Sequence, residues 1–138
     1  MRIGKKAIAV GTLAIGIALA GGAAANADTT LLGYNMIAPA FGQPVNTQLQ
    51  TKTYTNTAGY VQTGTIGGGG LYNANAKQCK YTFGSGISGC GTLVSNVYSY
   101  GYVHLPQTAP AGTSDVATFS IQGANFVRVQ ITGYWASN

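Results

Sequence analysis

The sequence predicts an all-β fold: a small antiparallel β-sandwich of the immunoglobulin-like or jelly-roll type, after a cleaved N-terminal signal peptide. Two observations support this fold class. Residues 47–135 are rich in Thr, Val, Tyr and Ile, and clusters of turn-forming residues interrupt them at short intervals. No stretch after residue 27 has the apolar period of an amphipathic helix. About seven or eight short strands in a chain of this length indicate two packed sheets or a small barrel.

The first 27 residues have the three parts of a secretory signal. A basic start precedes an uncharged apolar run at 7–20, and Ala-Asn-Ala at 25–27 forms a small-residue cleavage site. The run is shorter than the ~20 apolar residues that span a bilayer, so we expect cleavage rather than a retained anchor. The mature chain would begin at Asp28, keep 111 of the 138 residues and have no transmembrane segment. We therefore expect a secreted protein, extracellular or associated with the cell envelope.

The mature chain carries very little charge. Its net charge is +2, from Lys52, Lys77, Lys80 and Arg128 against Asp28 and Asp115. No basic stripe remains that could neutralise several phosphates, so we expect no nucleic-acid partner. The nine Tyr, four Phe and single Trp all follow residue 27, a composition typical of a folded chain rather than a disordered one.

The residues that most enzymes use are scarce. His104 is the only histidine, and the chain has two Asp and no Glu. Paired carboxylates would need Asp28, at the flexible new N-terminus, and a His/Cys metal site lacks ligands. A Ser-His-Asp triad with His104 and Asp115 lacks the G-x-S-x-G motif. We expect a protein that is not an enzyme, with no metal and no cofactor.

Residues 28–46 form an apolar N-terminal segment that Pro39 and Pro44 keep from being a continuous helix. Such a segment would be sticky as a mobile tail. We expect it to dock, either as an edge strand of its own domain, residues 47–138, or onto a partner by strand addition. The apolar residues of this docking segment are Leu31, Leu32, Tyr34, Met36, Ile37 and Phe41.

Residues 48–83 are predicted to hold a hairpin and two short strands. The strands at 48–55 and 60–66 bracket Asn-Thr-Ala-Gly, in which Gly59 suits a positive φ. Glycine weakens a strand interior, so the four glycines at 67–70 are predicted to form a turn. Residues 71–72 and 80–83 are predicted to be short strands around a polar loop at 73–78.

Cys79 and Cys90 are predicted to form a disulfide, because an exported protein with two nearby cysteines most simply pairs them. Two free thiols or an intermolecular bridge are the alternatives. Closing this short loop stabilises the fold by roughly 3 kcal/mol in the chain-entropy model.

The clearest predicted strand is 93–105. Its even positions place Tyr98, Tyr100, Tyr102 and His104 on one face, opposite aliphatic and small residues. The tyrosines either pack across a neighbouring strand, with their hydroxyls at the rim, or form an exposed platform for a sugar ring or a partner.

Two further strands are predicted at 116–122 and 125–135, after a proline-containing loop at 106–115. On the last strand, one face should be buried in the core. This face comprises Val127, Val129, Ile131 and Trp135.

No family motif is recognised, and the cysteine spacing does not match the inter-sheet bridge of an immunoglobulin domain. The export signal and size resemble those of many small secreted bacterial proteins, including adaptor subunits of secreted complexes and cell-envelope proteins. This resemblance concerns layout alone and assigns no residue.

The sequence therefore predicts a non-enzymatic binding or assembly module, foremost an adaptor or structural subunit of an extracellular or cell-surface protein complex. One alternative is a carbohydrate or cell-wall binding module that uses the tyrosine ladder. Another is a secreted inhibitor or toxin component. The expected partner is another secreted or cell-surface protein, or a cell-wall polysaccharide.

Overall fold

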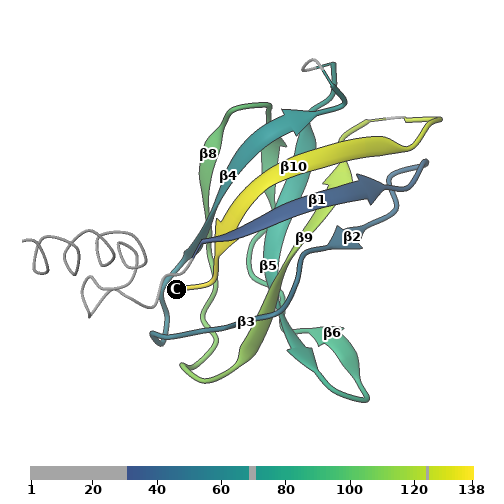
Figure 1. Cartoon of the computed structure of the whole chain (residues 1–138). Helices are drawn as coiled ribbons and strands as arrows, with labels where there is room; N and C mark the ends of the chain where they lie inside the picture. The colour runs from purple at the N-terminus through teal and green to yellow at the C-terminus, as the bar shows by residue number, and fades with distance from the viewer. Residues whose placement is uncertain (1–30, 69–70, 124) are drawn as a thin grey trace, which may run out of the picture. The chain divides into compact units, whose positions relative to one another are not determined.

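The computed structural model describes residues 31–68, 71–123 and 125–138, which form β-strands and turns with no helix (Figure 1). The all-β prediction is therefore confirmed, whereas the predicted signal peptide and Asp28 lie outside the described residues. No helix in the described part is long and apolar enough to cross a membrane. The strands are β1 (Leu32–Ala38), β2 (Val45–Asn46), β3 (Gln50–Thr51), β4 (Gly59–Ile66), β5 (Ala74–Thr82), β6 (Gly86–Ser88), β7 (Val94–Val97), β8 (Tyr102–Leu105), β9 (Ser114–Ile121) and β10 (Val129–Ala136).

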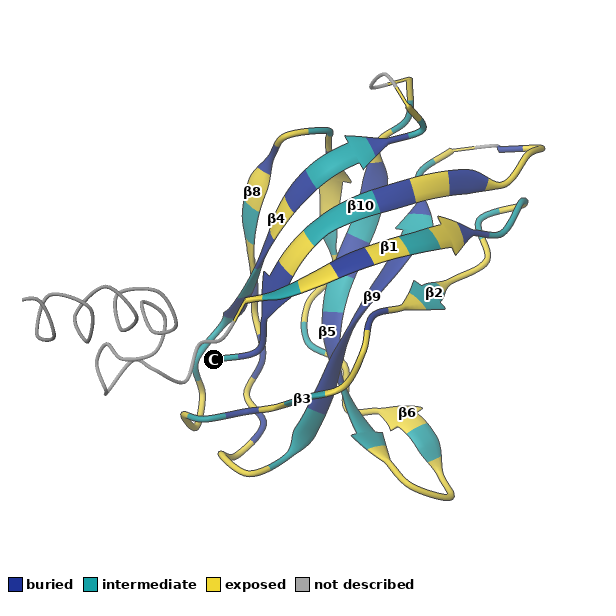
Figure 2. Ribbon diagram, viewed as in Figure 1, coloured by how far each residue is buried: buried dark blue, intermediate teal, exposed yellow. Residues whose placement is uncertain are grey.

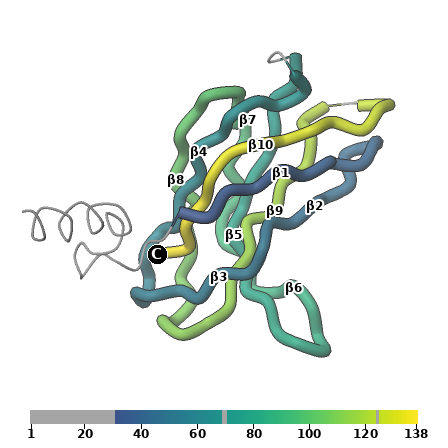
Figure 3. The backbone as a smooth tube through the Cα atoms, in the orientation of Figure 1, coloured from purple at the N-terminus to yellow at the C-terminus, as the bar shows by residue number. Residues whose placement is uncertain are grey.

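All pairings are antiparallel, and they divide the strands between two sheets. The first sheet has the order β1-β10-β4-β8 and is curled. The second has the order β2-β9-β5-β6, and β3 and β7 pair with β9 and β5 respectively. Figure 3 traces the chain as it passes from one sheet to the other.

The pairing is nested along the chain. β1 pairs with β10, β2 and β3 with β9, β4 with β8, and β5 with β7. The chain therefore resembles one long antiparallel hairpin that is wound into two sheets. Successive parts of this hairpin become neighbours in a sheet where β10 pairs with β4 and where β9 pairs with β5.

One hydrophobic core receives side chains from both sheets. Trp135, Ile131 and Ile66 come from the first sheet and are fully buried, as is Phe119 of the second. The ring of Tyr34 lies 5.2 Å from that of Phe119, centroid to centroid, and so joins β1 to the opposite sheet. More buried and more exposed residues alternate along β1 and the first part of β10 (Figure 2), as expected for strands with one face on a core.

The predicted core face of the last strand is confirmed for Val129, Ile131 and Trp135, which are at most 2% exposed. It is wrong for Val127, which is 53% exposed. Val127 precedes β10, which begins only at Val129, so the two-residue period does not extend back to it.

The predicted continuous strand at 93–105 is also wrong. β7 pairs with β5 and β8 pairs with β4, so the chain changes sheets between them. The change occurs through a turn in which Tyr100 has φ 59°. Because Tyr98 and Tyr100 lie outside both strands, the four-residue ladder does not form.

Two further predictions for residues 48–83 are corrected. The short strand β3 pairs with β9 rather than with β4, so the predicted hairpin is absent. The predicted polar loop at 73–78 lies largely within β5. In this strand Asn75 and Lys77 point outward, while Ala74 and Ala76 are buried. Alanine fills the inward positions of this strand, so its apolar alternation is weak.

Candidate functional site

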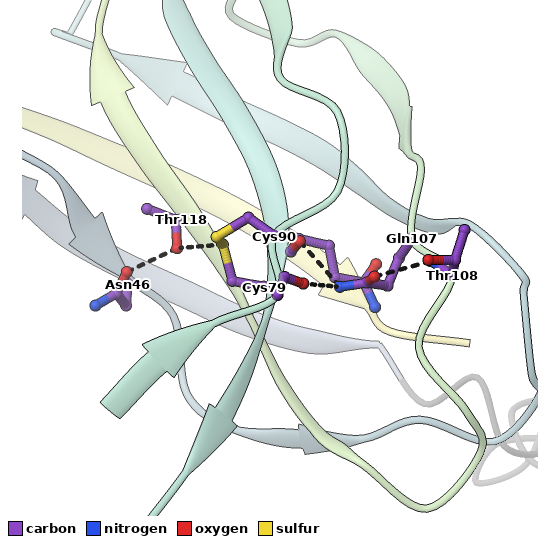
Figure 4. The surroundings of a disulfide bond; sticks show 8 residues. Asn46, Cys79, Cys90, Gln107, Thr108 and Thr118 are labelled. Carbon is purple, nitrogen blue, oxygen red and sulfur yellow. Dashed lines mark hydrogen bonds between the residues drawn. A yellow bond between two sulfur atoms is a disulfide. The ribbon is translucent and has the colours of Figure 1, made fainter. Parts of the chain in front are cut away.

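The Cys79–Cys90 disulfide is present, as predicted (Figure 4). It closes a loop that contains the β5–β6 hairpin. The Gln107 side chain donates hydrogen bonds to the carbonyls of Gln78 and Gly89, both at 3.1 Å, and thereby ties this loop to β5. The Thr118 hydroxyl lies 3.8 Å from the Cys79 sulfur. A disulfide is compatible with an extracellular, oxidising location.

The predicted docking segment contributes β1, which pairs with β10 of its own chain over seven residue pairs. Tyr34 is buried, and this burial raises the pKa of its hydroxyl. Leu32 and Met36 pack partly against the core, while Leu31, Ile37 and Phe41 are exposed. Within the described residues, β1 pairs with no second strand, so it is an edge of the sheet.

The tyrosines singled out in the sequence are exposed, by 59% for Tyr98, 78% for Tyr100 and 55% for Tyr102. Only Tyr102 and His104 share a strand, and their rings meet edge to face with centroids 5.4 Å apart. Tyr98 and Tyr100 lie in the turn before β8. A role of these four residues in binding stays a prediction.

Tyr60 of β4 completes an aromatic cluster that sequence reasoning missed. Its ring stacks on Tyr102 with a centroid distance of 5.2 Å and an interplanar angle of 28°. Burial, and to a lesser extent the neighbouring Tyr102 hydroxyl, raise the pKa of Tyr60. The contact follows from the β4–β8 register, in which Tyr60 lies opposite His104 and Gln62 opposite Tyr102.

The same register continues across the sheet to β10. Tyr134 pairs with Gln62 on one side and with Gly33 of β1 on the other. A Cβ atom at Gly33 would lie 3.4 Å from the Tyr134 ring, so this ring lies against the β1 backbone. We call the outward-facing side chains of this row and its neighbours the tyrosine face: Tyr60, Gln62, Tyr102, His104 and Tyr134.

An open groove of about 640 Å³ adjoins the tyrosine face. It is lined by Gly33, Asn35, Gln48, Gly64, Thr132 and Tyr134, with further contributions from Tyr34 and Gly133. A Cβ at Gly64 would approach the Thr132 hydroxyl to 2.6 Å, so the glycine leaves room beside that hydroxyl.

The groove has polar groups available for a ligand. Asn35 accepts a hydrogen bond from Gln130 at 2.8 Å, and Gln48 donates one to the Gly33 carbonyl at 2.9 Å. The Asn35 amide nitrogen and the Gln48 side-chain oxygen make no hydrogen bond to the described part of the chain. The groove therefore offers a donor, an acceptor and an aromatic wall, with no charged side chain among its lining residues.

A second cleft, of about 390 Å³, lies over the other sheet. It is lined mainly by Asn46, Asn75, Lys77, Ile87, Leu93 and Ser120, and Cys90 of the disulfide borders it. The cleft contains one cation and two amides, but no aromatic ring.

The potential acid and base of the chain are not brought together. Asp115 is fully buried, and it accepts hydrogen bonds from Gln78 at 2.6 Å and Thr113 at 3.2 Å. Burial raises the pKa of this carboxyl, and the two hydrogen bonds, Lys52 and Lys80 partly offset that rise. His104 instead lies on the exposed tyrosine face.

Lys52 is likewise buried, and its ammonium donates hydrogen bonds to Thr57 and to the carbonyls of Ser137 and Asn138. Burial lowers the pKa of Lys52. These contacts join the residue after β3 to the turn before β4 and to the residues after β10, so Lys52 has a structural role. Among the described residues, no group of three His, Cys, Asp or Glu side chains could hold a metal ion.

Sequence reasoning could have found part of the tyrosine face. Tyr134 shares the polar face of the last strand with Gln130 and Thr132, at two-residue spacing. Tyr60 likewise shares one face of β4 with Gln62. The missing information was the pairing of β8 with β4 and of β4 with β10, which joins residues from three distant segments.

Comparison with known proteins found no family model, no curated protein and no solved structure that matches this chain.

Proposed function

We propose that the protein is a secreted, non-enzymatic binding module whose tyrosine face and adjoining groove bind a neutral polysaccharide of a cell wall or extracellular matrix. The observation that carries the proposal is the groove beside Tyr134, where one exposed aromatic ring borders uncharged hydrogen-bonding side chains. Of the function classes that the sequence left open, carbohydrate binding fits this arrangement best.

The chemistry of the groove matches that of a sugar. An exposed aromatic ring offers an apolar face for the C–H groups of a pyranose, and this contact needs no charge. Amides and hydroxyls placed around such a ring fix the orientation of the ligand by hydrogen bonds to its own hydroxyls. Because neither Asn35 nor Thr132 carries a charge, the groove favours a neutral chain over an acidic one.

The strand order supports a jelly-roll form of the sandwich over the immunoglobulin-like form. With β2 and β3 counted as one interrupted strand and β6 as part of a protruding hairpin, eight strands remain. Their nested pairing divides them four and four between the sheets, as in a double Greek key. In this arrangement the outer face of β1-β10-β4-β8 is a broad surface on which a linear ligand could lie.

Sedimentation with insoluble polysaccharides tests the proposal. The protein should co-sediment with at least one of cellulose, chitin or purified peptidoglycan, and the Tyr102→Ala/Tyr134→Ala variant should lose this binding while keeping its circular dichroism spectrum. Phe83→Ala is the matched control, because Phe83 is 85% exposed but lies at the tip of the β5–β6 hairpin. Equal binding by the double variant and the native protein would contradict the proposal.

A role as an adaptor in a protein complex is the second candidate, supported by the edge strand β1. This edge exposes Ile37 and pairs on one side only within the described chain. An edge strand can accept a strand from a partner through main-chain hydrogen bonds. Native mass spectrometry of the protein from its own culture fluid tests this candidate. A heteromeric complex that Ile37→Lys disrupts would favour it, whereas a monomer would count against it.

A further inference from the structure

Two phenylalanines from opposite ends of the sequence meet at one end of the domain. Phe41 lies between β1 and β2, and Phe126 lies between β9 and β10. Their rings are edge to face, with centroids 5.9 Å apart and an interplanar angle of 85°. Phe41 is 71% exposed and Phe126 is 76% exposed, so neither ring contributes much to the core.

Phe41 is not the residue that its local backbone favours. Phe41 and Gly42 have φ angles of 63° and 67°, the pair of positive values typical of a two-residue type I′ turn. Asn, Asp or Gly usually occupies the first of these positions, because a bulky side chain is strained there. Phe41 therefore lowers the stability of the fold through its strained backbone conformation, and it leaves apolar surface in contact with water.

The buried Asn125 holds the two loops together. Its side-chain nitrogen donates hydrogen bonds to the carbonyls of Pro39 and Val127, at 3.2 and 3.0 Å. Its side-chain oxygen accepts one from the Gly42 amide at 2.8 Å, and its carbonyl accepts one from the Phe41 amide at 2.7 Å. Both rings are therefore presented on a fixed backbone.

One apolar and one cationic side chain follow Phe126 directly along the chain. Val127 is 53% exposed and Arg128 is exposed beside it. The single acidic residue in the described part of the chain, Asp115, is fully buried. We call Phe41, Phe126, Val127 and Arg128 the phenylalanine tip.

We propose that the phenylalanine tip inserts into the interfacial region of a lipid bilayer, with a preference for anionic lipids. Two rings that project from loops can enter the boundary between head groups and acyl chains, and Arg128 would lie beside them at the level of the phosphates. No exposed carboxylate in the described residues would oppose such contact.

The geometry favours a lipid surface over the other possible occupants. The edge-to-face pair presents a ridge rather than a flat ring platform for a sugar. A stable protein partner needs about 800 Å² of complementary surface on each side, which four residues do not supply. A fluid lipid surface needs no complementary shape, so a small protruding tip is sufficient.

Vesicle sedimentation tests the proposal with the purified protein. It should sediment with mixed phosphatidylglycerol and phosphatidylcholine vesicles, and Phe41→Asn/Phe126→Ser should weaken this binding by at least about tenfold. Asparagine suits the turn that Phe41 strains, so this variant should remain folded, as thermal unfolding would verify. Phe83→Ser is the control: Phe83 is 85% exposed and forms a similar edge-to-face pair with Tyr81 on the β5–β6 hairpin, so native-like binding of this variant would assign the binding to the phenylalanine tip.

A second arm tests the charge. Arg128→Gln should reduce binding to the mixed vesicles about fivefold and leave the weaker binding to pure phosphatidylcholine vesicles unchanged. Absence of sedimentation of the native protein, unchanged binding of the double phenylalanine variant, or unchanged binding of Arg128→Gln to the mixed vesicles would overturn the proposal. Self-association through the tip without vesicle binding would overturn it too, and would assign the tip to a second copy of the chain.

Discussion

The hydroxyl of Thr63 in β4 donates a 2.6 Å hydrogen bond to the carbonyl of Tyr98, which lies in the turn between β7 and β8. The same hydroxyl accepts a 2.8 Å hydrogen bond from the Gly101 amide, and the Thr63 side chain is nearly fully buried. One side chain of β4 therefore fixes the turn from which β8, and with it Tyr102, begins.

Replacing Thr63 with Val should remove both hydrogen bonds at nearly constant volume. The Gly101 amide and the Tyr98 carbonyl keep their 3.1 Å hydrogen bond to each other, so neither is left unpaired, and we expect destabilisation of roughly 1–2 kcal/mol, measured by urea unfolding. Thr92→Val is the control: Thr92 is exposed, and its loss should change stability by less than about 0.5 kcal/mol. Equal effects of the two substitutions would show that the turn is held by other contacts.

Ile131→Ala should destabilise the protein by roughly 2–5 kcal/mol, since Ile131 is fully buried between the sheets and the truncation leaves a cavity. Arg128→Ala, at an exposed position before β10, should have an effect within about 0.5 kcal/mol. Denaturant unfolding of the two variants measures the contrast. If the two losses were similar, the assignment of Ile131 to the core would be wrong.

Removing the disulfide with Cys79→Ser/Cys90→Ser should cost roughly 3 kcal/mol, because the unfolded chain regains the freedom of its closed loop. For a domain of this size the melting temperature should fall by on the order of 10 °C. Calorimetry of the native protein with and without a reductant gives an independent measurement. An unchanged melting temperature in both experiments would contradict the expectation.

Asp115 should make stability depend on pH. Its pKa in the folded state is raised, chiefly by burial, so the stabilisation from its protonated form is complete below the ordinary aspartate pKa of about 3.9. That stabilisation is lost as the pH rises through the raised value, where the folded state must ionise a buried group. The stability of Asp115→Asn relative to the native protein should therefore increase from acidic to neutral pH. Urea unfolding at a series of pH values measures this difference, and a constant difference would contradict the assignment.

Local patterns predicted the parts of the fold that depend on local chemistry. The two cysteines are close in sequence and flank turn-forming residues, and Val129, Ile131 and Trp135 keep a strict two-residue period. The edge-strand alternative for the N-terminal segment followed from the positions of its prolines.

The failures were at positions where tertiary contacts override local preference. Tyr100 adopts a positive φ although it is not a glycine. Its residue type therefore does not predict the turn that separates β7 from β8. The tyrosine face depends on strand pairing between distant segments, and no local pattern contains it. The phenylalanine tip escaped notice for the same reason, since Phe41 and Phe126 become neighbours only when β1 pairs with β10.

The nested pairing has a consequence for the order in which the chain can fold. β1 is synthesised before every other strand of the domain and β10 after them all, yet β10 lies between β1 and β4 in the finished sheet. Until β10 has been made and delivered, β1 and β4 both remain open edges, and the contacts that join them span nearly the whole domain. Pairing over such long sequence separations is slow. The domain should therefore complete its folding only after β10 emerges, and during that interval its apolar first described strand stays open to pairing with other chains.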